Sequence, residues 1–91
     1  MKQLHLKIHG RVQGVNFRWF VKEKADKFGL VGWVKNYPDG SVEVSVEGKE
    51  KKVQNFLVFC KTGPAFSKVE KVEEEWGEID ECKHKGFNIV F

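Results

Sequence analysis

Apolar and polar side chains alternate along the first dozen residues of the chain, which is the pattern of a half-buried β-strand. A second apolar stretch covers residues 30–37, and a strictly alternating third stretch covers residues 42–47. The tripeptide Pro38-Asp39-Gly40 between them is typical of a turn, so we expect the second and third strands to form a hairpin. The apolar positions of the first strand are Leu4, Leu6, Ile8 and Val12.

Two further segments carry apolar residues at the three- and four-residue spacing of an amphipathic helix. Asn16 is a candidate N-cap of the first helix, and Gly29 is placed to end it. The second helix is expected to end at Gly63-Pro64. The apolar face of the first helix comprises Phe17, Phe20, Val21, Ala25 and Phe28, and that of the second comprises Val53, Phe56, Leu57 and Cys60.

The C-terminal third of the chain predicts one long strand and one short strand, separated by a polar loop at residues 77–85. In the long strand, from Ser67 to Trp76, the spacing of Val69 and Val72 interrupts the alternation. We therefore expect this strand to carry a β-bulge or to be buried on both faces. The short strand is indicated by three alternating apolar residues, Phe87, Ile89 and Phe91.

This element order, βαββαβ followed by a short C-terminal strand, predicts an α+β, ferredoxin-like fold. In that fold an antiparallel sheet carries two helices on one face. The 91 residues are enough for one hydrophobic core, so we expect a single domain spanning residues 1–91. A chain of this size is expected to be a monomer.

Charge and hydropathy exclude some classes of function. The chain has 16 basic and 13 acidic residues, a net charge of +3 that lacks the clustered excess of a nucleic-acid-binding protein. It has no apolar run of about 20 residues and no secretory signal, so we expect a cytoplasmic protein that does not bind membranes. The excess of lysine and glutamate is typical of thermophilic proteins.

The two cysteines offer no recognised catalytic motif. Cys60 and Cys82 are too far apart for a CxxC pair, and neither is followed six residues later by the arginine of a cysteine phosphatase. We expect two thiols without a catalytic role, while a disulfide between them stays open.

The most informative segment is Gly10–Arg18, GRVQGVNFR, between the first predicted strand and the first predicted helix. Its two glycines permit backbone conformations that a side chain forbids. The helix start supplies free N–H groups and the positive end of the helix dipole. Arg18 adds a planar guanidinium suited to phosphate or carboxylate. Taken alone Arg18 is more often a solvated cation, but the whole segment predicts an anion-binding loop.

Asn36 is a second candidate site residue. It follows Arg18 by 18 positions and ends the second predicted strand. Its carboxamide offers both a donor and an acceptor, enough to orient a water molecule. An asparagine here, like the neighbouring Asp39-Gly40, is more often part of a turn. Its position relative to the loop favours a role in the site.

Both segments resemble the signatures of a known family, the acylphosphatases. The resemblance rests on Gly10–Arg18, on Gly32–Asn36 (GWVKN) and on Asp39–Val42 (DGSV), and it extends over nearly the whole chain. Gly63-Pro64-Ala65 followed by Val69 is also similar to that family's approach to its fourth strand.

The resemblance implies hydrolysis of a small-molecule acyl phosphate to a carboxylate and inorganic phosphate. It implies that Arg18 is the phosphate-binding catalytic arginine and that Asn36 positions the attacking water. Because the carboxylate is a good leaving group, we expect the reaction to need no metal and no cofactor. The resemblance assigns phosphate binding to the backbone N–H groups of Gln13, Gly14, Val15, Asn16, Phe17 and Arg18.

Three other functions stay open. His5 and His9 share one side of the first strand, but four residues of strand separate them by about 13 Å, too far for one metal ion. Lys85–Phe91 resembles an RNA-recognition motif, although such a motif is followed by a further helix and strand. A phosphate-binding module with little turnover, as in a maturation factor that handles carbamoyl phosphate, is expected to carry extra domains.

Two groups of side chains have less specific predictions. A basic stripe on the first strand is expected to face Glu43 and Glu47 across the open side of the sheet and to be charge-balanced rather than to bind nucleic acid. The stripe consists of His5, Lys7, His9 and Arg11. The aromatic residues near the two signature segments are assigned to the core in preference to an acyl-binding surface; they are Trp19, Phe20, Trp33 and Tyr37.

Overall fold

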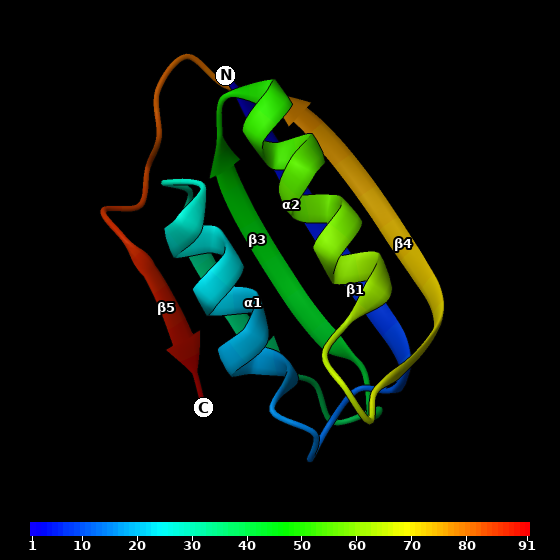
Figure 1. Ribbon diagram of the computed structural model, residues 1–91. Helices are drawn as coiled ribbons and strands as arrows, with labels where there is room; N and C mark the ends of the chain where they lie inside the picture. The colour runs from blue at the N-terminus through cyan, green and yellow to red at the C-terminus, as the bar shows by residue number, and fades with distance from the viewer.

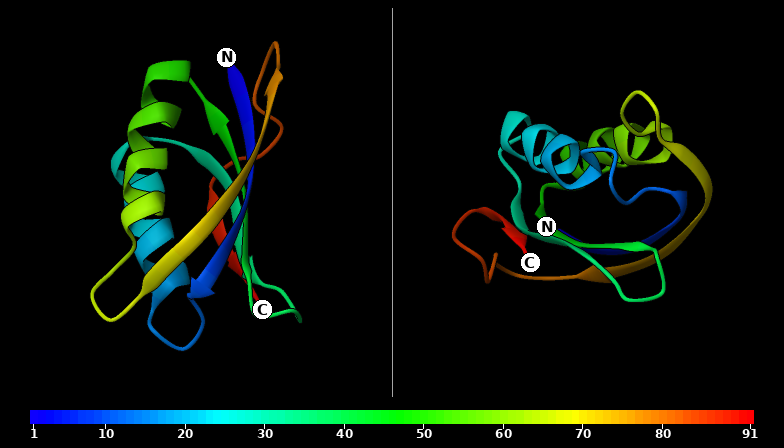
Figure 2. Two further views of the ribbon diagram at one scale, coloured as in Figure 1. Left: turned by 90° about the vertical axis from the view of Figure 1, so that its right-hand side faces the viewer. Right: turned by 90° about the horizontal axis from the view of Figure 1, so that it is seen from below.

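The computed structural model describes all residues, 1–91, as two layers, a five-stranded sheet and two helices that cover one of its faces (Figures 1 and 2). The expected α+β, ferredoxin-like fold is confirmed. The elements follow one another as β1 (Lys2–Arg11), α1 (Phe17–Lys27), β2 (Val31–Asn36), β3 (Val42–Gly48), α2 (Glu50–Thr62), β4 (Lys68–Glu78) and β5 (Phe87–Val90).

The sheet has the strand order β4-β1-β3-β2-β5. All pairings among β1, β2, β3 and β4 are antiparallel, but β5 lies parallel to β2, so the sheet is mixed. This parallel pairing directs β5 toward the same end of the sheet as β2. The loop after β1, the start of α1 and the C-terminus all lie at that end, the bottom of Figure 1.

The core lies between the sheet and the helices. Alternation along β1 turns Leu4, Leu6 and Ile8 toward the helices, and all three are completely buried. Seventeen buried hydrophobic residues form one cluster, in which the apolar faces of both helices take part. Burying each large aliphatic side chain contributes about 1.5–3 kcal/mol, so this cluster fixes the helices on the sheet.

The strand β4 carries the expected β-bulge. Its pairing with β1 shifts between His9 and Gly10, where the partners change from Lys71 to Val69 and leave Glu70 unpaired. The extra residue allows Val69 and Val72 to face the helices although they are three positions apart. The alternative, a strand buried on both faces, is wrong, because most of β4 is exposed.

Gly10 is a structural requirement of this bulge. Its φ of +126° is rarely adopted by other residues, and a Cβ atom there would collide with the backbone carbonyl of Lys68. The first signature segment contains two glycines, Gly10 and Gly14. Gly10 is required for the close packing of β1 against β4.

The two cysteines are free thiols. Cys60 is buried in the core face of α2, and this burial raises the pKa of its thiol well above the ordinary value. Cys82 lies in the loop before β5 and is half-buried. Neither helix is long and apolar enough to cross a membrane.

Candidate active site

The β1–α1 loop, the first turn of α1 and the end of β2 enclose a hollow of about 200 Å³, which we call the inner hollow. It brings together Arg18 and Asn36, the two residues that the sequence selected from separate elements. Both side chains are half-buried. The inner hollow is lined by Val12, Gly14, Asn16, Phe17, Arg18, Trp19 and Asn36.

The β1–α1 loop (residues 12–16) reaches this shape through two left-handed residues. Gly14 has a φ of +75° and Asn16 a φ of +63°. Asn16 does stand at the N-cap position, but its side chain makes no capping hydrogen bond, so the expected cap is wrong in its chemistry. A left-handed conformation is tolerated by asparagine better than by most residues, which explains its presence here.

The N-terminus of α1 is electrostatically open to an anion. Its first turn contains no acidic residue, whereas Lys24 and Lys27 complement the dipole at the other end. The helix α2 differs, because Glu50 occupies its first turn and Lys61 its last. Only α1 therefore begins with free N–H groups that no carboxylate of its own first turn balances.

Arg18 keeps its charge available. It takes part in none of the nine ion pairs of the chain. Its guanidinium carbon lies 4.7 Å from the centre of the Phe91 ring. Such a cation–π contact restrains the guanidinium while leaving its N–H donors free for an anion. The sequence did not indicate this contact, which depends on the parallel pairing of β5.

The side chain of Gln13 joins the β1–α1 loop to the turn between β2 and β3. Its amide nitrogen donates hydrogen bonds to the carbonyls of Tyr37 and Ser41, at 2.8 and 2.9 Å. Because Tyr37 follows Asn36 directly, this bridge fixes the distance between the loop and the Asn36 segment. The sequence had selected Gln13 for its backbone N–H alone.

The β2–β3 turn itself is held by Asp39, as its sequence predicted. The Asp39 carboxylate accepts hydrogen bonds from the hydroxyl and the backbone N–H of Ser41, and it pairs with Lys7 at 3.0 Å. These contacts, the hydroxyl bond foremost, lower the pKa of Asp39 well below its usual range. Gly40, with a φ of +94°, completes the turn between β2 and β3.

We expect all four aromatic residues near the two signature segments to be core residues, but the structure shows that two of them are exposed. Trp19 is 62% exposed and Tyr37 is 40% exposed. Phe20 and Trp33 are half-buried, and Trp33 packs edge-on against His5 on the open face of the sheet. The expectation fails most clearly for Trp19, which stands at the edge of the inner hollow.

Three residues of the basic stripe, His5, Lys7 and His9, lie against carboxylates on the open side of the sheet, whereas Arg11 makes no ion pair. His5 lies 2.9 Å from Glu43, Lys7 pairs with Asp39, and His9 lies 2.6 Å from Glu73. These pairings agree with a balanced solvent-exposed face. No group of three or more potential ligands among the His, Cys, Asp and Glu side chains comes together as a metal site.

Two details differ from the sequence-based picture of this face. Glu47 is only 1% exposed, and its carboxylate accepts hydrogen bonds from the backbone N–H groups of Lys83 and His84. It therefore anchors the loop before β5 instead of balancing the stripe. The segment that resembles an RNA-recognition motif forms β5, an edge strand, whereas that motif belongs on an inner strand.

The chain resembles known proteins over nearly its whole length. The family model for acylphosphatase matches residues 4–89. The acylphosphatase of Bacillus subtilis (strain 168) is 45% identical over 91 residues, 100% of this chain and 99% of the relative. That of Thermococcus kodakarensis is 43% identical over 86 residues, 94% of this chain and 92% of the relative.

Solved structures give the same result. The crystal structure of acylphosphatase from Bacillus subtilis superposes with a TM-score of 0.95 at 45% identity and covers 100% of both chains. The chain is also similar, with a TM-score of 0.86 and 33% identity, to 12% of full-length HypF in its phosphate- and nucleotide-bound form, and this match covers 100% of the present chain. The chain therefore belongs to the acylphosphatase family and is an enzyme of that type.

Proposed function

We propose that the inner hollow hydrolyses acyl phosphates, with Arg18 and the backbone N–H groups of residues 13–18 holding the phosphoryl group and Asn36 holding the attacking water. The observation that carries the proposal is the convergence of Arg18, the β1–α1 loop and Asn36 on one hollow of about 200 Å³. The proposed site needs no residue from a second subunit, and we propose that the enzyme acts as a monomer.

Phosphate binding follows from the charges around the hollow. An anion there meets the positive end of α1, which has no acidic residue in its first turn, and the unpaired guanidinium of Arg18. A guanidinium presents its N–H donors as a planar fork, so it can hold two phosphoryl oxygens at once. Backbone N–H groups of the loop complete a fixed set of donors, which stabilises charge on the oxygens during phosphoryl transfer.

Beyond phosphate binding, the hydrolysis needs only a positioned water molecule from the protein. The oxygen of the water held by Asn36 bonds to phosphorus while the bond from phosphorus to the acyl oxygen breaks, and the electron pair leaves with the carboxylate. A carboxylate has a pKa of about 4, so it departs without a general acid. One proton of the water passes to a phosphoryl oxygen of the substrate. Because Asn36 has no titratable proton to give, its role is to orient the water.

The test is steady-state release of phosphate from benzoyl phosphate in the presence of EDTA. We expect Arg18→Ala to lower kcat/KM at least about 10²–10³-fold, the usual cost of removing one preorganised donor. Asn36→Ala should lower kcat and leave KM within a few-fold, because water does not bind the substrate. Arg18→Lys is the matched control for charge without the fork, and it should recover only part of the loss.

Full activity of Asn36→Ala would remove the water-positioning role, and loss of wild-type activity in EDTA would contradict the metal-free reaction.

A second candidate function rests on the similarity to part of HypF, whose structure is described as phosphate- and nucleotide-bound. It is a phosphate-binding module with little turnover. Steady release of many equivalents of phosphate per chain separates the enzyme from this module.

A further inference from the structure

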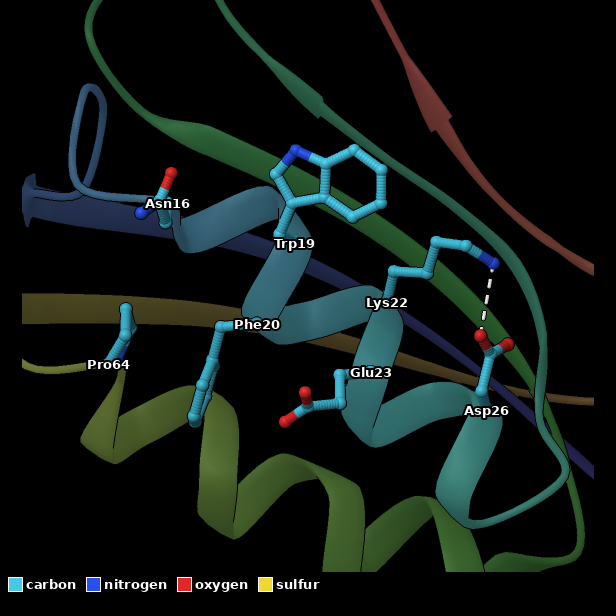
Figure 3. A pocket seen from close by; sticks show the side chains of 7 residues that line it. All are labelled: Asn16, Trp19, Phe20, Lys22, Glu23, Asp26 and Pro64. Atoms are coloured by element: carbon cyan, nitrogen blue, oxygen red, sulfur yellow. Dashed lines mark hydrogen bonds and ion pairs between the residues drawn. The ribbon is translucent and has the colours of Figure 1, made fainter.

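A second hollow lies beside the inner one, on the solvent side of α1. We call it the outer hollow; its volume is about 630 Å³, which is the size range of small-molecule sites. It shares Asn16 and Trp19 with the inner hollow, so the two hollows adjoin each other at these residues. Figure 3 shows the side chains that line it: Asn16, Trp19, Phe20, Lys22, Glu23, Asp26 and Pro64.

The exposure of the Trp19 side chain is not explained by the packing of the fold. The indole is 62% exposed at the first turn of α1, and in Figure 3 it stands away from Phe20 and Pro64, which lie toward α2. A large exposed aromatic side chain beside a polar site marks a place where an apolar group is covered on binding. Its position between the two hollows puts that place directly next to the phosphoryl group of a bound substrate.

The charges of the outer hollow limit what it can hold. Its only cation, Lys22, already donates hydrogen bonds to Asp26 at 3.0 Å and to the carbonyl of Phe87 at 2.9 Å, as Figure 3 shows for Asp26. Glu23 is exposed and pairs at 3.8 Å with Lys24, which does not line the outer hollow. An anionic group would therefore meet no free cation here, and an uncharged group is favoured.

The geometry of the reaction directs the acyl group to the same place. In an in-line displacement the leaving oxygen lies opposite the attacking water across the phosphorus atom. Asn36, which would hold that water, borders the inner hollow and not the outer one. The outer hollow, which adjoins the inner one at Asn16 and Trp19, is therefore the space that we assign to the leaving group.

We propose that the outer hollow is the acyl-binding subsite of this enzyme and that Trp19 selects acyl phosphates whose acyl group is flat, apolar and uncharged. The inference rests on the proposed function, because it takes the inner hollow as the phosphoryl site. Trp19 stacks on the acyl group and contributes to its binding, while Arg18 and the loop bind every acyl phosphate alike.

The experiment compares benzoyl phosphate, which has an aromatic acyl group, with acetyl phosphate, which has none. Trp19→Ala should raise KM for benzoyl phosphate about five-fold, the effect of losing one aromatic stacking contact, and should change KM for acetyl phosphate less than two-fold. Trp19→Phe keeps a flat ring and should recover most of the preference. The matched control is Trp76→Ala, another exposed tryptophan, on β4 opposite Leu4 at the far end of β1.

Inhibition by inorganic phosphate separates this inference from the proposed function. Its inhibition constant should change less than two-fold in Trp19→Ala, because Trp19 stands at the edge of the inner hollow and the phosphate is held by Arg18 and the N–H groups of the loop. An unchanged ratio of kcat/KM for the two substrates in Trp19→Ala would overturn the acyl subsite and leave the phosphoryl site standing. An Arg18→Ala variant with full activity would instead overturn the proposed function itself.

A third substrate tests the chemical class. Succinyl phosphate carries a carboxylate at the far end of its acyl arm, where Glu23 and Asp26 would repel it. We expect its kcat/KM to be lower than that of benzoyl phosphate. A higher value would overturn the assignment of an uncharged acyl group.

Discussion

Replacing Gln13 with alanine would remove the two hydrogen bonds that join the β1–α1 loop to the β2–β3 turn. The two carbonyls would not be orphaned, because Ser41 O also accepts from Tyr37 N and Tyr37 O also accepts from Gly40 N. The cost is then near the low end for two net hydrogen bonds, about 1–2 kcal/mol in the free energy of unfolding. For a domain of this size each kcal/mol lowers Tm by about 4–8 °C.

The same change should loosen the site. Without the bridge, the loop that holds phosphate and the residue that holds water are no longer fixed to each other, and small misplacements cost enzymes much of their rate. We expect kcat of Gln13→Ala on benzoyl phosphate to fall about ten-fold, with Asn36 itself intact. Thermal unfolding and steady-state kinetics of the full chain measure the two effects separately.

Two further variants sharpen the test. Gln13→Glu keeps the shape but aims a carboxylate at two carbonyl oxygens and adds negative charge near the anion site, so it should be less stable than Gln13→Ala and should bind phosphate more weakly. Gln54→Ala removes a single exposed hydrogen bond to Glu50 on α2 and should change neither Tm nor kcat measurably. Wild-type Tm and kcat in both Gln13 variants would refute the bridging role.

Three smaller predictions concern the C-terminus, the turn and the glycines. Deleting Phe91 removes the cation–π contact with Arg18, worth about 0.5–1 kcal/mol at an exposed site, so phosphate inhibition should weaken about two- to five-fold and Tm should fall by about 2–8 °C. The pKa of Asp39 is lowered in the folded state, so the stabilising contribution of its carboxylate is present above the unfolded pKa of about 3.9 and is lost as pH falls through the folded pKa. The difference in Tm between wild type and Asp39→Ala should therefore shrink below about pH 4. A difference that stays constant with pH would contradict this. Gly10→Ala should cost about 2–5 kcal/mol in urea unfolding because it combines a forbidden φ with a backbone collision, whereas Gly14→Ala, with open space around it, should cost only about 1–2 kcal/mol.

Local patterns predicted the elements well because the first strand and both helices bury one face each. Leu4, Leu6 and Ile8 alternate, and Val53, Phe56 and Leu57 recur at helical spacing, so their burial follows from period alone. The pair Arg18 and Asn36 was also found, since the two residues end or begin elements whose order fixes their neighbourhood.

The features that the sequence missed depend on what packs against a residue after folding. Glu47 continues an alternating strand, yet the loop before β5 covers it and supplies two backbone donors. Trp19 has a large, largely apolar side chain of the kind usually found in a core. It faces outward, however, because Phe17 and Val21 already fill the inner face of its helix. Neither outcome is encoded in the local spacing of apolar residues. Both require the path of a segment distant in sequence.

The site combines three features that are each unfavourable in the free protein and become favourable with an anion present. Asn16 adopts a left-handed conformation, which costs a non-glycine residue about 1–2 kcal/mol. The N-terminus of α1 lacks an acidic residue, although α2 shows that this chain can provide one. Arg18 is half-buried without an ion pair, although the rest of the chain makes nine.

A phosphoryl group in the inner hollow would offset all three costs, because successive N–H groups of a left-handed turn form an anion-binding concavity and both positive charges would gain a partner. The stability of the free protein is therefore lower than the same fold could reach, and ligand binding should restore the difference. Inorganic phosphate should raise Tm in proportion to the logarithm of its concentration above its dissociation constant. The rise should disappear in Arg18→Ala and persist in Trp19→Ala, because Arg18 supplies charge and hydrogen-bond donors to the phosphoryl group in the proposed complex and Trp19 supplies neither.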